Sequence, residues 1–366
     1  MRGGTDSLTA REKKVFASML LITKAMTGSL ANSWTSVGNA QYLSMLISSL
    51  ISILLAFIVY YICKKADAPF FAAAEKYIGG IFSKLYALIL IVTLILSARS
   101  VAYLLSSTVV SVSLTKARLS VVSLSAIGAS IIVAVLGIKA VCRFSMLVLP
   151  LALISLIMTL IMSLDSADIH HLFPILGSGP IDIVMLSLTS SSDFFLILLL
   201  GEMYDPNKGQ KDNKKLLIYP PIIAGIISTG LYLINTLVFP YTFTQLSPLY
   251  GIISVVGVSK SFKALGSLFS FIWNTVFLIT LCAHFCFLGH LSSKVLSVFS
   301  KKEGIPIFIF GFILLVLTLS DMRSFPKFLS FLFEAPKTLP LFVYSPLIPI
   351  LILSAIRSKG AKDESG

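Results

Sequence analysis

Charged and hydroxyl side chains lie where the chain is otherwise strongly apolar. The segment "LSLTSSSDFFL" places Asp193 after a run of hydroxyl residues between two apolar stretches, and Lys24 and Arg99 interrupt two other apolar stretches. Ionisable side chains inside a bilayer are costly, and they usually mark a ligand, ion or gating site. We expect Lys24 and Asp193 to bind a ligand or to take part in gating, with Arg99 bordering the same cavity.

Ion pairing is the structural alternative for these three side chains. Asp193 could neutralise either Lys24 or Arg99, and the remaining cation would then leave an excess positive charge that a ligand carboxylate could balance. Arg99 could instead extend its head group toward the membrane interface. Counted at about 1.5 Å per residue, the charges lie roughly 15–22 Å from the membrane boundaries, near the middle of a core about 30 Å thick.

The elements that must position these residues are membrane helices. The chain has 366 residues, of which 56% are hydrophobic and 12% charged, and its mean hydropathy is +0.94. Apolar stretches of about 20 residues recur along it, which is typical of transmembrane helices. We predict an all-α integral membrane protein with ten transmembrane helices. The predicted spans are 14–36, 39–62, 80–107, 118–137, 141–163, 181–201, 216–239, 265–291, 304–320 and 337–356.

The net charge of +13 does not indicate a nucleic-acid-binding protein, because the basic residues lie in short connections between apolar spans. Most of the 29 Lys and Arg residues lie at the N-terminus and in every second connection. Cytoplasmic loops of membrane proteins carry such an excess. We therefore predict that both termini lie in the cytoplasm.

The ten predicted spans form two sets of five that enter the membrane from opposite sides, which is the parity of an inverted-topology repeat. The first span of each set is interrupted at its middle, by Gly28 in one and by "TSSSD" in the other. The expected organisation is an N-terminal tail 1–13, a first repeat 14–163, an outer loop 164–180, a second repeat 181–356 and a C-terminal tail 357–366.

Both interruptions predict discontinuous helices. An unwound segment exposes backbone groups that lipid cannot satisfy, so it persists only beside a cavity or a ligand. The N-terminus of a half-helix suits a carboxylate, and its C-terminal carbonyls suit a cation or an ammonium group. The alternative is that the Ser and Thr side chains donate to carbonyls of their own helix or permit close packing.

Other motifs give no sign of a cofactor or an enzyme. In "CAHFC", Cys282 and Cys286 share one helix face while His284 points about 200° away, so the three cannot converge on a metal ion. The outer segment "LDSADIHHLFP" is better explained by solvated loop residues than by a metal site. The sequence has no phosphate loop, zinc signature or nucleophile elbow. We predict a non-enzymatic protein without cofactor or metal.

Five segments carry a family resemblance through their order and spacing. They are "HHLFPILGSGP" before the sixth span, "FFLILLLGEMYDPNKGQKDNKK" at its exit, "FPYTFTQLSPLYGIISVV" after the seventh, "IWNTVFLITLCAHFCFLGHLSSKVL" in the eighth and "YSPLIPILILSAIRSKG" in the last. Together they resemble the spore germination permease family, the B subunit of GerA-type germinant receptors. That family belongs to the amino acid–polyamine–organocation superfamily, and the likeness covers essentially the whole chain.

The resemblance implies a LeuT-like fold in which helices 1 and 6 are discontinuous and recognise the germinant between them. It also implies an A-type membrane subunit and a C-type lipoprotein subunit as partners, and a location among the lipids of the spore inner membrane. The departures from the family pattern are the very polar "TSSSD" and the buried Lys24. The expected ligand-binding residues are Lys24, Thr27, Gly28, Ser29, Arg99, Thr189, Ser190, Ser191, Ser192 and Asp193.

Two functions remain open from the sequence. In the first, the protein is the membrane subunit of a germinant receptor. A small nutrient, with an amino acid as the leading candidate, binds near the bilayer midplane and shifts a conformational equilibrium that is passed to the partner subunits. In the alternative, it is a secondary transporter that couples amino acid uptake to H⁺ through Asp193, or to Na⁺ at unwound carbonyls.

Overall fold

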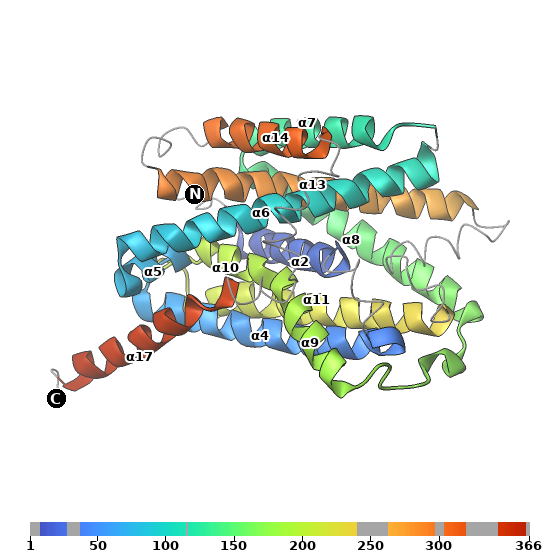
Figure 1. The fold of residues 1–366 in the computed structure, drawn as a ribbon. Helices are drawn as coiled ribbons and strands as arrows, with labels where there is room; N and C mark the ends of the chain where they lie inside the picture. The colour runs from blue at the N-terminus through green and yellow to red at the C-terminus, as the bar shows by residue number, and fades with distance from the viewer. Residues whose placement is uncertain are drawn as a thin grey trace.

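The computed structural model describes residues 8–27, 37–114, 116–239, 263–296, 304–319 and 343–363, which form helices and short connections without any strand (Figure 1). The helices are α2 (Ala10–Thr27), α4 (Gln41–Ala66), α5 (Phe70–Ile78), α6 (Gly80–Thr108), α7 (Leu119–Val135), α8 (Ile138–Ser163), α9 (Pro180–Ser191), α10 (Leu196–Leu200), α11 (Gln210–Val238), α13 (Lys263–Val295), α14 (Gly304–Leu319) and α17 (Leu347–Asp363).

Among the described residues, six helical segments are long and apolar enough to cross a membrane. They are Gly38–Ala66, Gly80–Ser111, Ile138–Ser166, Pro180–Met203, Gln210–Val238 and Leu268–Val295. Many large apolar side chains on these segments are exposed, as expected for surfaces that face lipid rather than water. The prediction of an all-α integral membrane protein is confirmed.

The remaining apolar helices are shorter, so the predicted number of ten spans is not established. They are Leu119–Val135, Gly304–Leu317 and Leu347–Ile356. The tenth span was expected at 337–356, but α17 begins at Leu347 and continues to Asp363. Residues 337–342 and the end of the first predicted span, 28–36, lie outside the described residues.

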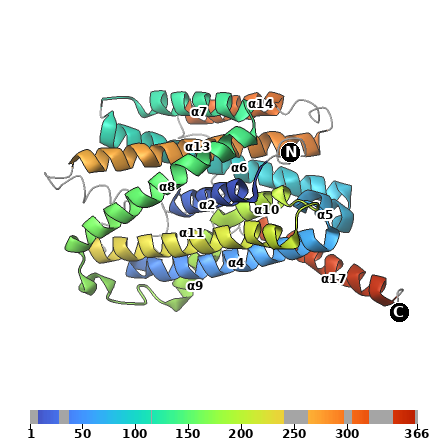
Figure 2. The same ribbon diagram turned by 180° about the vertical axis from the view of Figure 1, so that it is seen from behind.

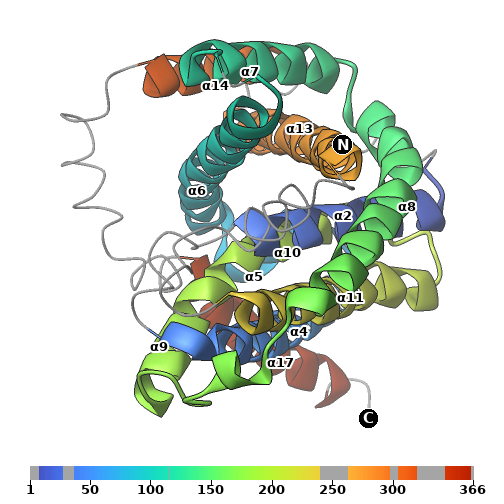
Figure 3. The same cartoon turned by 90° about the vertical axis from the view of Figure 1, so that its right-hand side faces the viewer.

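The helices form two groups, seen end-on in Figure 3. In one group α4 and α11 pack against each other, with α9 on α4 and α2 on α11. In the other group α6, α7, α13 and α14 pack together. Helix α8 contacts both α2 and α13, and Figure 2 shows its oblique course across the back of the molecule. Within the first group, α2 and α10 lie on the side that faces the second group (Figure 3).

Small residues permit the closest helix contacts in the first group. A Cβ atom on Gly225 of α11 would lie 2.7 Å from Cβ of Ser49 on α4, so only glycine fits at this position without movement. Helices α4 and α9 are joined by the Ser48 hydroxyl, which donates to the Ser187 carbonyl at 2.8 Å. Close backbone approach and interhelical hydrogen bonds thus hold α9 and α11 against α4.

The long connection after the second span contains an amphipathic helix, α5. Its buried face consists of Phe70, Phe71, Ala73, Ala74 and Tyr77. This face packs against α4 and α6 and against the end of the sixth span.

The first helix, α2, begins with a capping box. The backbone N–H of Thr9 donates to the Glu12 carboxylate at 2.6 Å, and the backbone N–H of Glu12 donates to the Thr9 hydroxyl at 3.2 Å.

Candidate functional site

The sixth span is interrupted where the sequence predicts. Helix α9 ends at Ser191, residues Ser192–Phe195 form a 3₁₀ turn, and α10 follows. The hydroxyls of Ser191 and Ser192 donate to carbonyls three residues earlier, each at 2.7 Å. The interruption is therefore a tightened turn rather than extended chain. Its hydroxyls stabilise it by the back-bonding that the sequence left as the alternative.

Lys24 and Asp193 form an ion pair between the first and the sixth span. The Lys24 Nζ atom lies 3.5 Å from Oδ1 of Asp193, and the two side chains are 6% and 15% exposed. Lys24 lies near the end of α2, and Asp193 lies in the 3₁₀ turn of the sixth span. The pairing that the sequence offered as an alternative is present. It places both charges at the expected meeting point of helices 1 and 6.

Two tyrosines contribute to the same region. The hydroxyl of Tyr344, just before α17, donates to the backbone carbonyl of Ser191, at the point where the helical hydrogen-bond pattern of α9 ends. Tyr232 on α11 and Tyr344 both lie close enough to Asp193 for its charge to act on them. The carboxylate thus has aromatic hydroxyl groups in its surroundings as well as an ammonium partner.

The second helix group contributes a histidine. The Ser97 hydroxyl on α6 lies 2.8 Å from Nε2 of His284 on α13, and Nδ1 of His284 lies 2.7 Å from the Thr280 carbonyl. Because a carbonyl can only accept, Nδ1 carries the hydrogen, and Nε2 of a neutral ring accepts from Ser97. His284 is fully buried, and the charge of Lys24 acts on it. From the sequence, His284 is considered only as a metal ligand, and that role is excluded.

The other predicted site residues differ in their contacts and exposure. The Thr189 hydroxyl donates to the Met185 carbonyl at 3.0 Å, within its own helix. Arg99 lies two residues after Ser97 and so leaves α6 about 200° away from the direction that reaches His284, with its side chain partly exposed. Gly28 and Ser29 lie outside the described residues, as does the side chain of Thr27. Ser190 is partly exposed at the end of α9.

The arrangement offers an ammonium, a carboxylate, an imidazole and several hydroxyls at the boundary between the two helix groups. These are the groups that bind a small zwitterion, because each of its charges meets an opposite charge in a largely apolar surrounding. Within the described part of the chain, no group of three or more His, Cys, Asp or Glu residues could hold a metal ion.

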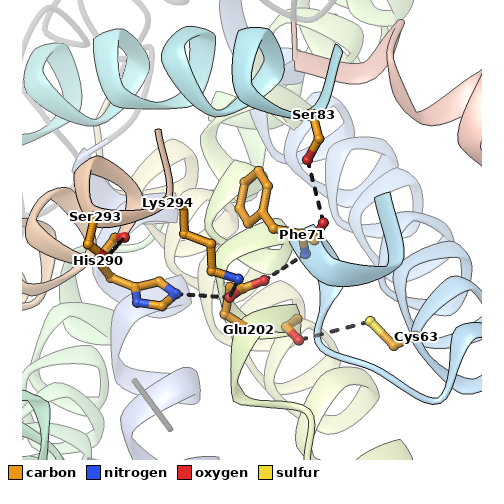
Figure 4. Close-up of polar contacts among 8 residues, drawn as sticks. Cys63, Phe71, Ser83, Glu202, His290, Ser293 and Lys294 are labelled. Carbon is orange, nitrogen blue, oxygen red and sulfur yellow. Dashed lines mark hydrogen bonds and ion pairs between the residues drawn. The ribbon is translucent and has the colours of Figure 1, made fainter. Parts of the chain in front are cut away.

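A second polar cluster lies directly after α10, at the end of this helix away from Asp193 (Figure 4). We refer to α10 as the inner half of the sixth span. Glu202, in the turn Gly201–Met203 that follows α10, is buried and accepts from three donors. The backbone N–H of Phe71 lies 2.6 Å from its Oε1 atom, while Nε2 of His290 and Nζ of Lys294 lie 2.9 Å and 3.0 Å from its Oε2 atom. Glu202 is not among the residues predicted from the sequence. The available signal was an acidic residue at the end of the sixth predicted span, together with His290 and Lys294 at the end of the eighth.

Solved structures with this helix arrangement are LeuT-type transporters. The chain is similar to Mhp1, a nucleobase-cation-symport-1 family transporter solved in a closed conformation with bromovinylhydantoin bound (TM-score 0.65, 12% identity, 93% of this chain and 91% of that one). It is also similar to a Na⁺-coupled sialic acid symporter (TM-score 0.65, 14% identity, 97% and 90%). A third similar structure is MhsT in complex with L-phenylalanine (TM-score 0.60, 13% identity, 91% and 87%). The predicted LeuT-like fold is confirmed.

Comparison of the sequence with known families identifies the family to which the chain belongs. Residues 13–325 match the family described as spore germination protein, and the chain therefore belongs to that family. A sequence comparison with curated proteins gives no match. The family resemblance is confirmed, and four of the five sequence segments lie within the matched residues, whereas the segment at 344–360 lies beyond them. The class of protein is a transporter-like membrane protein of spore germination.

Proposed function

We propose that the protein is the membrane subunit of a spore germinant receptor and binds a small nutrient, with an amino acid as the leading candidate, beside Lys24 and Asp193. The observation that carries this proposal is the buried ion pair between α2 and the turn of the sixth span. A zwitterionic ligand matches this pair, since its carboxylate complements Lys24 and its ammonium complements Asp193. Binding would replace the single Lys24–Asp193 ion pair with two ion pairs, one between Lys24 and the ligand carboxylate and one between Asp193 and the ligand ammonium.

The site also suits a conformational signal. Lys24 and Asp193 belong to the first helix group, whereas Ser97 and His284 belong to the second. A ligand that contacts both groups stabilises the arrangement in which they are closest, and it can shift the equilibrium only by its difference in affinity for the two states. In this proposal both termini lie on the spore-core side of the inner membrane, and an A-type membrane subunit and a C-type lipoprotein subunit receive the signal.

The alternative is a secondary transporter for an amino acid. It is favoured by the solved structures of similar fold, among them a Na⁺-coupled symporter and a nucleobase-cation-symport-1 family transporter. In this chain the ammonium of Lys24 already occupies the cation position beside Asp193. Coupling to H⁺ would require Asp193 to take up a proton and release Lys24. Coupling to Na⁺ would place the ion at backbone carbonyls of the interrupted helices.

Germination of spores that carry single substitutions tests the receptor. Asp193→Asn removes the charge while keeping the shape of the side chain, and Asp182→Asn is the matched control because Asp182 is exposed in the first turn of the same span. We expect loss of the nutrient response in Asp193→Asn spores and an unchanged response in Asp182→Asn spores, at equal protein levels. An unchanged nutrient response in Asp193→Asn spores contradicts the proposal.

Uptake by proteoliposomes distinguishes the two functions. The purified protein is reconstituted, an H⁺ or Na⁺ gradient is imposed, and accumulation of labelled amino acid is measured. Accumulation that depends on the gradient supports the transporter. Binding without accumulation supports the receptor.

A further inference from the structure

Glu202 connects the sixth span with α5 and α13 at the end of α10. Its carboxylate accepts from α5 through the backbone N–H of Phe71 and from α13 through His290 and Lys294. The side chain of Glu202 is 2% exposed, whereas that of Lys294 is 33% exposed. Lys294 also lies over the Phe71 ring, with Nζ 5.9 Å from the ring centroid, and the Ser83 hydroxyl on α6 lies 3.4 Å from the Phe71 carbonyl. Figure 4 shows Phe71, His290 and Lys294 around Glu202, and the hydrogen bond from Ser83 to Phe71 beside them.

These contacts restrain the sixth span rather than a surface loop. A buried carboxylate that loses its partners pays a large desolvation penalty, so the cluster is stable only when all its donors are in place. Charge-assisted hydrogen bonds of this kind are about twice as strong as neutral ones. Loss of one donor from the cluster is therefore costly unless water reaches the carboxylate in its place.

The restraint reaches the ligand site through a rigid segment. Asp193 and Glu202 lie at opposite ends of the stretch that contains Phe194, Phe195 and the whole of α10, all buried. A second tie lies beside the first, since Nζ of Lys13 in α2 donates to the Met203 carbonyl at 3.2 Å. The inner halves of both spans that carry the Lys24–Asp193 pair are thus fixed at the same end.

We propose that Glu202 is a positioning residue whose cluster with Phe71, His290 and Lys294 holds the inner half of the sixth span against α5 and α13. The cluster thereby keeps the path from the cytoplasmic end to the Lys24–Asp193 site closed. Release of the cluster frees α10 to move away from α13 and admits water along the path. This inference deepens the proposed function, because release of the inner half-helix is the movement by which an event at the ligand site reaches the face where α5 lies.

Cys63 provides a reporter next to the cluster. It is fully buried on α4, and its Sγ atom lies 3.9 Å from the carbonyl of Gly201, the residue before Glu202. Cys282, buried in the middle of α13, provides the internal reference. The experiment uses two full-length proteins, each with one of these cysteines retained and the other three replaced by Ala, and measures labelling by a membrane-impermeant maleimide from the cytoplasmic side.

We expect Glu202→Gln to raise the labelling rate of Cys63 roughly tenfold or more and to leave that of Cys282 unchanged, because removing the charge weakens two charge-assisted bonds at one oxygen. Glu75→Gln is the matched control, since Glu75 lies exposed on α5, and we expect no change in it. Protection of Cys63 in Glu202→Gln equal to that in the unsubstituted protein overturns the proposal. Equal increases for Cys63 and Cys282 also overturn it, because they indicate general loosening.

Lys294→Gln replaces Glu202→Gln if the latter does not give a monodisperse protein. Lys294 is partly exposed, so its loss leaves the apolar packing in place, and the same selective increase at Cys63 is expected. No ligand is used in these measurements. Failure of the cluster proposal therefore leaves the ligand site untouched, and failure of ligand binding at Asp193 leaves the labelling result standing.

Discussion

At the scale of single residues, the structure resolves the alternatives that the sequence left open for the buried charges. Asp193 could have paired with Lys24 or Arg99, and the ion pair is with Lys24. Sequence spacing alone could not decide between them, because it fixes the depth of each residue but not the direction in which its helix faces. For the same reason it could not find His284, whose partner Ser97 lies 187 residues away.

The Lys24–Asp193 pair predicts a specific pattern in a double-mutant cycle. Either Lys24→Met or Asp193→Leu leaves one buried charge without its partner and should destabilise the protein by about 3–5 kcal/mol. The double substitution should restore most of that stability, because two apolar side chains replace the pair, but it should not restore ligand binding. Thermal unfolding of the four proteins in detergent measures the first effect. A double variant as unstable as the singles would show that the two side chains do not depend on each other.

Gln41 offers a second prediction at this scale. Both polar atoms of its side chain amide are buried and have no hydrogen-bond partner in the described part of the chain. A buried amide without partners costs about 1–3 kcal/mol. We expect Gln41→Met to raise the unfolding temperature, because Met has a similar length and no polar group to satisfy. The comparison is with Gln210→Met, an exposed position at the start of α11, where no gain is expected.

At the scale of elements, the apolar stretches of the sequence predict the positions of most helices but not the residues at which those helices begin and end. The second, third and fifth predicted spans, 39–62, 80–107 and 141–163, correspond closely to α4, α6 and α8. Helix α11 begins at Gln210, six residues before the predicted span, because a helix can continue into water after its apolar part ends. Hydropathy reports the lipid-facing part of a helix, whereas backbone hydrogen bonds determine its length.

The contact between α4 and α11 gives a prediction with an internal control. A Cβ atom at Gly225 would collide with Ser49, whereas one at Gly230, on the same helix, would have no described atom within 4 Å apart from the nearby backbone of its own helix. We expect Gly225→Ala to destabilise the protein by about 1–3 kcal/mol through overpacking. Gly230→Ala should instead be neutral or stabilising by up to about 1 kcal/mol, since Ala favours the helix. Unfolding temperatures that are equal in the two variants would contradict the described packing.

At the scale of the whole molecule, the site lies where the two helix groups of Figure 3 meet, because Lys24 and Asp193 belong to the first group and His284 to the second. The family and the transporter-like fold could be inferred from the order and spacing of sequence segments in the second half of the chain together with the pattern of apolar spans along the whole chain. The inverted repeat of 14–163 and 181–356 stays a prediction. So does the role of Gly28 and Ser29, which lie outside the described residues.

Direct ligand binding tests the central claim most simply. A panel of labelled amino acids is applied to the purified protein in nanodiscs, with Asp193→Asn and the control Asp182→Asn measured beside the unsubstituted protein. The account predicts saturable binding of at least one amino acid, lost in Asp193→Asn and kept in Asp182→Asn. Saturable binding that is unchanged in a folded Asp193→Asn protein would contradict it, because the ligand would then bind away from the Lys24–Asp193 pair.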